Sequence, residues 1–292
     1  MIKKTTMVSG ISLLLLIGVI SLAVNLCPKK KSDLPETVSV YDRAAGTVYT
    51  PTYEDFLTGC VEGMLIKNVA FEPEALKAIA IVQNTRIKYH LNPKSGFENL
   101  GADFSVSEYT PYTRDTPSEE VKSAVKCALN STFTFDGETF NVPICKISTG
   151  RTDECPPYSL SVNLPCDINA PAFESSAAFT PEEVRSALNG GNLPYNCTEW
   201  LHDPVYSSGG TLLYIELDDV RISGETLKNA FGLRSSAISA DYTEDKFVFT
   251  CQGWGENKGM SVYAANYLAK QGKTAEEILR LFYPYAEIKV KE

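Results

Sequence analysis

Two stretches of helical periodicity follow one another between Tyr53 and His90. In the first, the apolar positions recur at helical spacing and form one stripe: Phe56, Leu57, Cys60, Val61 and Met64. The second begins at Pro73, and its alanines at 75, 78 and 80 permit close packing against another element. Gln83 and Arg86 lie on or beside its otherwise apolar face. Such polar side chains need partners, so they either cap a neighbouring loop or bind a ligand.

Strand and helix patterns alternate along the rest of the chain. Alternating residues predict strands at 38–41, 47–50, 212–217 and 246–251, and an Asp136-Gly137 turn predicts a hairpin over 132–142. Capping residues predict helices that begin after Thr116 or Ser118, after Thr180 and after Thr274. With no internal repeat, this order predicts one α+β domain over 37–292, with mixed strands and several helices.

The N-terminal segment differs in composition. Met7 to Leu26 is an apolar run after Lys3 and Lys4, and twenty residues of helix span roughly 30 Å, the thickness of a hydrocarbon core. We expect residues 1–31 to form an uncleaved transmembrane signal anchor and 32–36 a short linker. A cleaved signal peptide and a lipoprotein modified at Cys27 are the alternatives, but the residues before both cleavage points are a poor fit.

Charge and cysteine spacing exclude several functions. Of 27 lysines and arginines, 22 follow the N-terminal segment, against 36 acidic residues, a net charge of −14. Such acidity argues against nucleic acid as a partner and against loose adhesion to anionic wall polymers. No pair of cysteines has metal-finger spacing. Four cysteines cluster in a loop-rich region and predict at least one disulfide there: Cys145, Cys155, Cys166 and Cys197.

Several motifs together resemble the SpoIID/LytB family, and the resemblance runs from Thr37 to Lys289. They are Phe71-Glu-Pro-Glu-Ala-Leu-Lys-Ala78 with Arg86 after it, Ile144-Cys-Lys-Ile-Ser-Thr-Gly-Arg-Thr152, Tyr158-Ser-Leu-Ser-Val-Asn-Leu-Pro-Cys-Asp167 and Gly232-Leu-Arg-Ser235. The most specific match is Gly253-Trp-Gly-Glu-Asn-Lys-Gly-Met-Ser-Val-Tyr-Ala-Ala265, a glycine-rich strand-to-helix turn. Cys145 and Glu256 stand where the family has histidine.

The resemblance implies activity on peptidoglycan, because SpoIID-type members are lytic transglycosylases that cut glycan strands stripped of their peptides. Such a reaction needs one acid/base carboxyl group. Counted from Gly59, the family's catalytic glutamate falls on Met64, and counted back from Glu74 it falls on Ile66. Glu62 and Glu256 are the nearby carboxylates that could replace it.

The resemblance also implies a set of contacts to substrate or scaffold: Arg86, Ser148, Gly150, Gly259, Ser261 and Tyr263. The resemblance implies a cysteine-containing zinc loop in some members of the family, but Ser105 stands where the first of those cysteines would be. We therefore expect no metal and no cofactor.

Three hypotheses remain open. The chain binds denuded glycan strands with weak or no lyase activity, or it is an active lytic transglycosylase with a relocated acid, or it is a regulatory enhancer of a cell-wall amidase. In each case we expect a single-pass membrane protein with its C-terminal domain outside the cytoplasm. The expected partners are glycan strands, a cell-wall amidase or endopeptidase, and a membrane partner.

Overall fold

The computed structural model describes residues 34–42, 45–92, 102–105, 112–113, 116–188, 196–197 and 200–289. Contacts divide the chain into Met1–Glu36 and Thr37–Glu292. Helices and small sheets mix in the second unit, which confirms the α+β class. The predicted transmembrane helix lies outside the described residues. Among the residues that are described, no helix is long and apolar enough to cross a membrane.

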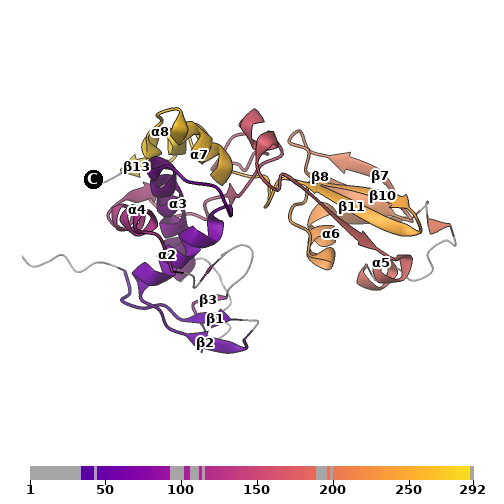
Figure 1. Cartoon of the computed structure of the whole chain (residues 1–292), viewed down its shortest axis with the longest axis horizontal. Coiled ribbons are helices and arrows are strands. Elements are labelled where there is room, and N and C mark those ends of the chain that lie inside the picture. Colours follow the sequence, from indigo (N-terminus) through magenta and orange to yellow (C-terminus); the bar gives the residue numbers. More distant parts are fainter. Residues whose placement is uncertain are drawn as a thin grey trace, which may run out of the picture. The chain divides into compact units, whose positions relative to one another are not determined.

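Helix α3 is the centre of the helical packing. It contacts α2, α4, α7 and α8 (Figure 1). Its alanines at 75, 78 and 80 are fully buried, which allows neighbours to approach closely on several sides. The described helices are α2 Tyr53–Met64, α3 Pro73–Leu91, α4 Glu119–Leu129, α5 Pro181–Ala187, α6 Gly224–Phe231, α7 Val262–Lys270, α8 Ala275–Phe282 and the 3-10 helix η2 Pro165–Asn169.

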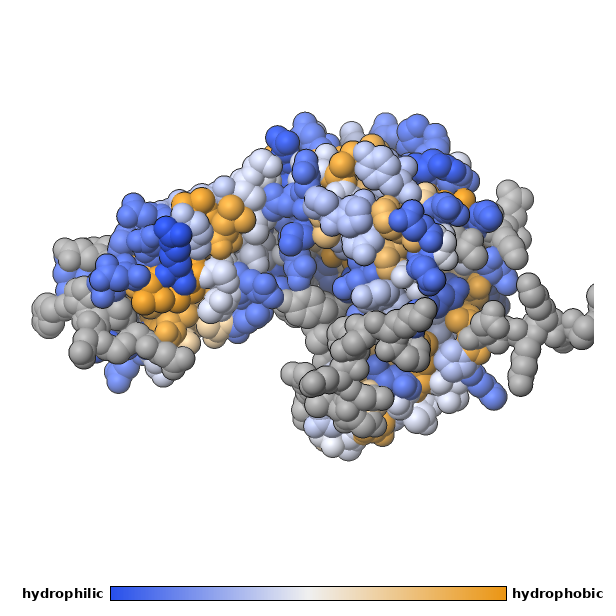
Figure 2. Space-filling view, turned by 180° about the vertical axis from the view of Figure 1, so that it is seen from behind, coloured by the Kyte–Doolittle hydropathy of each residue, from blue (hydrophilic) through white to orange (hydrophobic). Residues whose placement is uncertain are grey.

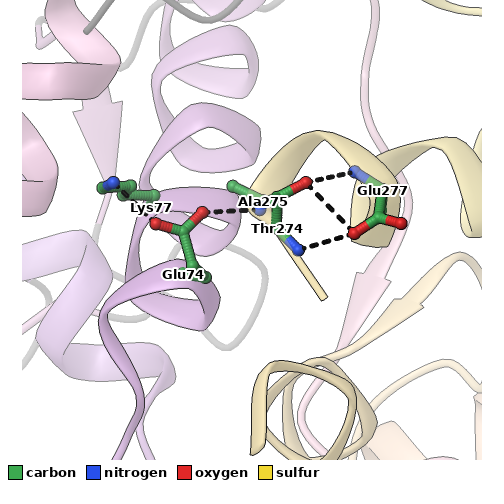
Figure 3. A network of polar contacts seen from close by, with 5 residues as sticks. All are labelled: Glu74, Lys77, Thr274, Ala275 and Glu277. Atoms are coloured by element: carbon green, nitrogen blue, oxygen red, sulfur yellow. Dashed lines mark hydrogen bonds and ion pairs between the residues drawn. The ribbon is translucent and has the colours of Figure 1, made fainter. Parts of the chain in front are cut away.

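Side-chain caps define the helix ends as the sequence predicts. Ser118, one of two predicted candidates, caps α4, and Thr180 with Glu183 forms a capping box on α5. A second capping box joins Thr274 to Glu277 on α8. Glu74, in the first turn of α3, accepts a hydrogen bond from the Ala275 amide at 2.8 Å and pairs with Lys77 at 2.6 Å (Figure 3). This carboxylate thus links the N-terminal turns of α3 and α8.

The strands form five small sheets of two or three strands each in the described part of the chain. Their orders are β2-β1-β3, β10-β11-β6, β7-β8-β9, β12-β5 and β13-β4. The bounds are β1 Val40–Asp42, β2 Thr47–Tyr49, β3 Phe104–Ser105, β4 Thr132–Thr134, β5 Ile144–Cys145, β6 Glu174–Phe179, β7 Leu201–Tyr206, β8 Leu212–Leu217, β9 Val220–Ser223, β10 Ile238–Thr243, β11 Lys246–Gln252, β12 Met260–Ser261 and β13 Glu287–Lys289.

The strands predicted at 38–41 and 47–50 correspond to β1 and β2, which pair antiparallel, whereas the hairpin predicted over 132–142 forms only in part. Asp136 and Gly137 adopt the positive φ of a tight turn, and Phe135 pairs with Glu138 across it. The expected return strand is absent from the described residues, and β4 pairs antiparallel with β13 at the other end of the unit. Burial of Phe133 and Ile288 explains this long-range pairing.

A second apolar core lies within the β-rich segment, residues 174–252, which carries β6 to β11. It joins Val184 of α5 and Leu227 of α6 to Trp200, Phe247 and Phe249, all of which are fully buried. Outside this core, Leu213 and Val220 are exposed. Figure 2 shows one face of the molecule, on which apolar patches lie among mainly hydrophilic side chains.

Candidate functional site

The glycine-rich motif bridges β11 to β12 and α7. Gly253, Gly255, Asn257 and Gly259 all have positive φ, which lets the backbone reverse repeatedly over seven residues. A Cβ atom on Gly259 would collide with the Pro143 carbonyl, so only glycine fits there. This close approach allows β12 to pair in parallel with β5, which brings the 144–152 and 253–265 motifs side by side.

A buried carboxylate connects these two motifs to the third. Asp167, on η2, accepts hydrogen bonds from the Ser148 amide at 2.8 Å and the Ser148 hydroxyl at 2.6 Å. The Ser261 side chain also bonds to it. Burial raises the pKa of Asp167 above its ordinary value, although the hydrogen bonds from Ser148 and Ser261 act in the opposite direction.

The burial of these residues makes them a scaffold. Ser148, Ser261 and Asp167 are fully buried, and the Ser261 hydroxyl also accepts the Ala264 amide at 3.2 Å as the cap of α7. Gly150 is buried as well, with positive φ and the Ile168 side chain against it. The predicted site residues Ser148, Gly150, Gly259 and Ser261 therefore lie together and hold the motif in shape.

Tyr263 belongs to an apolar cluster beside this scaffold. Its amide donates to the Lys146 carbonyl at 3.0 Å, and its side chain is half-buried. The cluster is built on Ile66, Ile147 and Ala170, and partly buried apolar residues pack on it: Val69, Phe71, Phe173, Trp254 and Tyr263. Ile66, one of the two positions expected for the catalytic acid, is thus an apolar residue among the motif residues. The other, Met64, is also buried.

Glu62 lies on a different structural feature. Its carboxylate accepts the backbone amide of Ser118 at 3.1 Å, at the N-terminus of α4. A carboxylate is favourable at this end of a helix. The contact gives Glu62 a local role in joining α2 to α4.

Glu256 and Arg86 come within electrostatic reach of each other. Burial lowers the pKa of Arg86, and the negative charge of Glu256 partly opposes that effect. Glu256 is half-buried on the glycine-rich turn. Cys145, in the family's histidine position, is fully buried, and burial raises its pKa well above the ordinary value, so it remains a neutral thiol.

Asn257 is a site residue that the sequence did not reveal. Its buried side chain accepts the Thr149 amide at 3.1 Å and donates to the carbonyls of Arg151 at 3.1 Å and Gly209 at 3.0 Å. It therefore ties the 144–152 motif to the turn before β8. The signal was its replacement of a family glycine, because asparagine is the residue that best tolerates left-handed φ after glycine. Asp167 is a second site residue that the sequence analysis did not select, although its position at the end of the Tyr158–Asp167 motif could have indicated it.

The predicted disulfide is wrong. Any bridge among the four clustered cysteines would include Cys145, Cys155 or Cys166, and all three are unbridged. Each lies on a different feature: Cys145 is buried on β5, Cys155 is in a turn, and Cys166 has its sulfur 3.8 Å from an oxygen of Asp167. Cys197 packs on the core of the β-rich segment. Clustering along the sequence therefore did not produce a disulfide.

One group of potential metal ligands occurs in the described part of the chain, away from the motifs. His202 and Glu216 face each other across β7 and β8, and Asp203 follows His202. The His202 Nδ1 atom lies 3.0 Å from Asp203, and Glu216 pairs with Arg221 at 3.3 Å, so all three side chains already have partners.

The structure defines an α+β protein in which a glycine-rich turn and a buried carboxylate hold three motif segments together. No protein-family model matches the chain. Stage II sporulation protein D of Bacillus subtilis (strain 168) is 24% identical over 281 residues, which cover 87% of this chain and 79% of that protein. Stage II sporulation protein D of Bacillus amyloliquefaciens is 24% identical over 279 residues, 88% of this chain and 79% of that protein. These similarities confirm the resemblance predicted from the motifs: the chain is SpoIID-like.

Proposed function

We propose that this chain is a sporulation protein that binds denuded peptidoglycan glycan strands and has weak or no lytic transglycosylase activity. The similarity to Stage II sporulation protein D over most of the chain supports the sporulation role. The association of the motif segments through Asp167, β5 and β12 supports retention of a binding site. We further propose that residues 1–31 anchor the chain in the cell membrane with the rest outside the cytoplasm.

One observation carries the proposal of weak or absent catalysis. Both positions that the family motif assigns to the acid, Met64 and Ile66, hold buried apolar side chains, with exposed fractions of 4% and 5%. A methionine or isoleucine cannot protonate a glycosidic oxygen. Glu62 accepts the Ser118 amide at the N-terminus of α4, which supports a structural role for it over that of the missing acid.

The test combines binding and product analysis. Purified full-length protein is incubated with denuded glycan strands and with intact sacculi, and the bound fraction is measured by co-sedimentation. The products are analysed by mass spectrometry for anhydro-muramic ends, with an active lytic transglycosylase as the positive control. We expect binding to denuded strands without appreciable anhydro product. If the protein bound neither the denuded strands nor the intact sacculi, the result would contradict the proposal and favour the amidase-enhancer hypothesis.

An active lyase that uses Glu256 is the second candidate. The observation that favours it is the half-buried position of Glu256 on the glycine-rich turn, where its charge acts on Arg86. If anhydro ends do form, Glu256→Gln abolishes them under this hypothesis. Glu154→Gln is the matched control and leaves them unchanged, because Glu154 is exposed and follows Asp153, whose amide donates to the Asn257 carbonyl of the turn.

A further inference from the structure

Two cations lie against the indole ring of the glycine-rich motif. The Lys146 Nζ atom is 4.4 Å from the Trp254 ring centroid, and the Arg234 guanidinium carbon is 4.7 Å from it. Both distances are within the range of attractive cation–π contacts. All three side chains are half-buried, so a ligand can reach them from solvent.

Backbone hydrogen bonds hold the three residues in this arrangement. The Trp254 amide donates to the Ile147 carbonyl at 2.7 Å, and the Lys146 amide donates to the Trp254 carbonyl at 2.9 Å. The Gly255 amide donates to the Arg234 carbonyl at 2.9 Å. Three segments that are distant in sequence therefore present two positive charges on one ring in a preorganised geometry. Preorganisation of this kind reduces the entropic cost of binding.

The charge at this position contrasts with the rest of the chain. The chain as a whole has a formal net charge of −9, whereas two cations lie against this one aromatic ring. Among the described residues, none of the ion pairs includes Arg234. The aromatic and apolar neighbours Phe71, Phe173 and Tyr263 lie in the same cluster as Trp254. Aromatic surface combined with a few fixed polar groups is typical of a ligand-binding site.

We propose that Lys146 and Arg234, held on Trp254, bind the free lactyl carboxylate of a muramic acid residue in the glycan. This inference rests on the proposed function, and it identifies what distinguishes a denuded strand from a peptide-bearing one. Removal of the peptide leaves a negatively charged carboxylate on the sugar, whereas an attached peptide leaves a neutral amide at that atom. The guanidinium fork of Arg234 matches a carboxylate in a bidentate geometry, and Lys146 supplies a second point charge.

The experiment compares denuded strands with the same strands after their carboxylates are converted to neutral amides. Full-length protein in detergent is titrated with both, at low and at physiological salt. We expect wild-type protein to bind the amidated strands about tenfold more weakly, a difference that two charge-assisted contacts readily supply. Its binding to denuded strands falls as salt rises.

Substitutions then assign the effect to residues. We expect Arg234→Met and Lys146→Met each to weaken binding to denuded strands about fivefold or more, with no more than about a twofold effect on amidated strands. Arg234→Lys retains the charge and restores part of the affinity. Arg185→Met is the matched control, because Arg185 lies over another indole, Trp200, at 5.1 Å and outside this cluster. It binds both strands as the wild type does. Unchanged circular dichroism and melting temperature show that each variant is folded.

The outcomes separate the two proposals. Wild-type protein that binds denuded and amidated strands equally well, or Met variants that bind denuded strands as the wild type does, would overturn the carboxylate site and leave glycan binding intact. Wild-type protein that binds neither strand would overturn the proposed function and this inference together.

Discussion

The Ser148–Asp167 contact makes a quantitative prediction about what holds the motif segments together. Ser148→Ala removes a fully buried hydroxyl that donates to the Asp167 carboxylate at 2.6 Å. The same oxygen accepts the Gly150 amide at 3.2 Å, so the substitution also leaves that amide without its acceptor. The Ser148 backbone amide still donates to Asp167, and the Ser261 side chain still bonds to it.

The expected loss follows from the types of hydrogen bond removed. A hydrogen bond to a charged group contributes about 1.5–3 kcal/mol, and a buried amide without a partner costs about 1–3 kcal/mol. Because relaxation recovers part of this, we expect the free energy of unfolding to fall by about 2–4 kcal/mol at pH 7. Asp167→Ala combined with Ser148→Ala in a double-mutant cycle should give a coupling energy of about 1.5–3 kcal/mol.

The pH dependence gives an independent check of the charge. In the wild type, burial raises the pKa of Asp167, so the folded state binds this proton more tightly than the unfolded chain. This group therefore makes the protein less stable as pH rises from the ordinary pKa of aspartate to the raised one. The Ser148 hydroxyl favours the ionised carboxylate, so its removal is most costly above the pKa of Asp167. The difference between variant and wild type should shrink as pH falls through that value.

Urea denaturation followed by tryptophan fluorescence and circular dichroism measures these differences. Ser176→Ala is the control, because Ser176 is exposed and its side chain bonds only to the neutral Thr250 hydroxyl, at 3.0 Å, among the described residues. It should change stability by less than about 0.5 kcal/mol. A loss for Ser148→Ala below about 1 kcal/mol at pH 7, or a loss independent of pH, would refute the role of a buried hydrogen bond to an ionised carboxylate.

Three further predictions concern other contacts. Asn257→Ala should lower the free energy of unfolding by about 2–4 kcal/mol, because it removes the side-chain hydrogen bonds to Thr149, Arg151 and Gly209 at a left-handed position. Asn257→Gly keeps the backbone freedom and should lose less stability; equal losses in urea denaturation would exclude a backbone contribution. Glu74→Gln should cost only about 0.5 kcal/mol, because its side chain and that of Lys77 are 35% and 37% exposed. Burial raises the pKa of Glu74, but the hydrogen bonds from Lys77 and Ala275 outweigh burial and lower that pKa. The stability that the Glu74 carboxylate contributes is therefore present above the ordinary pKa of glutamate and is lost as pH falls through the lowered value. A stability loss for Glu74→Gln that grows on acidification in thermal melts would contradict this sign. Glu62→Gln keeps an acceptor for the Ser118 amide, so it should leave stability, glycan binding and any strand cleavage unchanged. A loss of measurable strand cleavage in this variant would identify Glu62 as the catalytic acid.

Local chemistry determined the helices. Tyr53–Met64 and Pro73–Leu91 follow from apolar periodicity and Pro73, and the capping boxes at Thr180 and Thr274 mark their helices directly. These signals act over three or four residues, so the sequence alone contains them. The motif order was likewise sufficient to predict the SpoIID-like family, which the comparisons support.

Contacts between distant segments depended on tertiary structure. The sequence shows Ser148, Asp167 and Ser261 in three separate motifs, but only the parallel pairing of β5 with β12 brings them to one buried carboxylate. The same dependence explains the two failed expectations. The clustered cysteines face different elements, and β4 pairs with β13 instead of with the segment just after it. Trp254 shows the limit most clearly, because neither Lys146 nor Arg234 is near it in sequence. Helix signals are short-range, whereas strand pairing and side-chain proximity depend on which apolar surfaces bury each other across the whole unit.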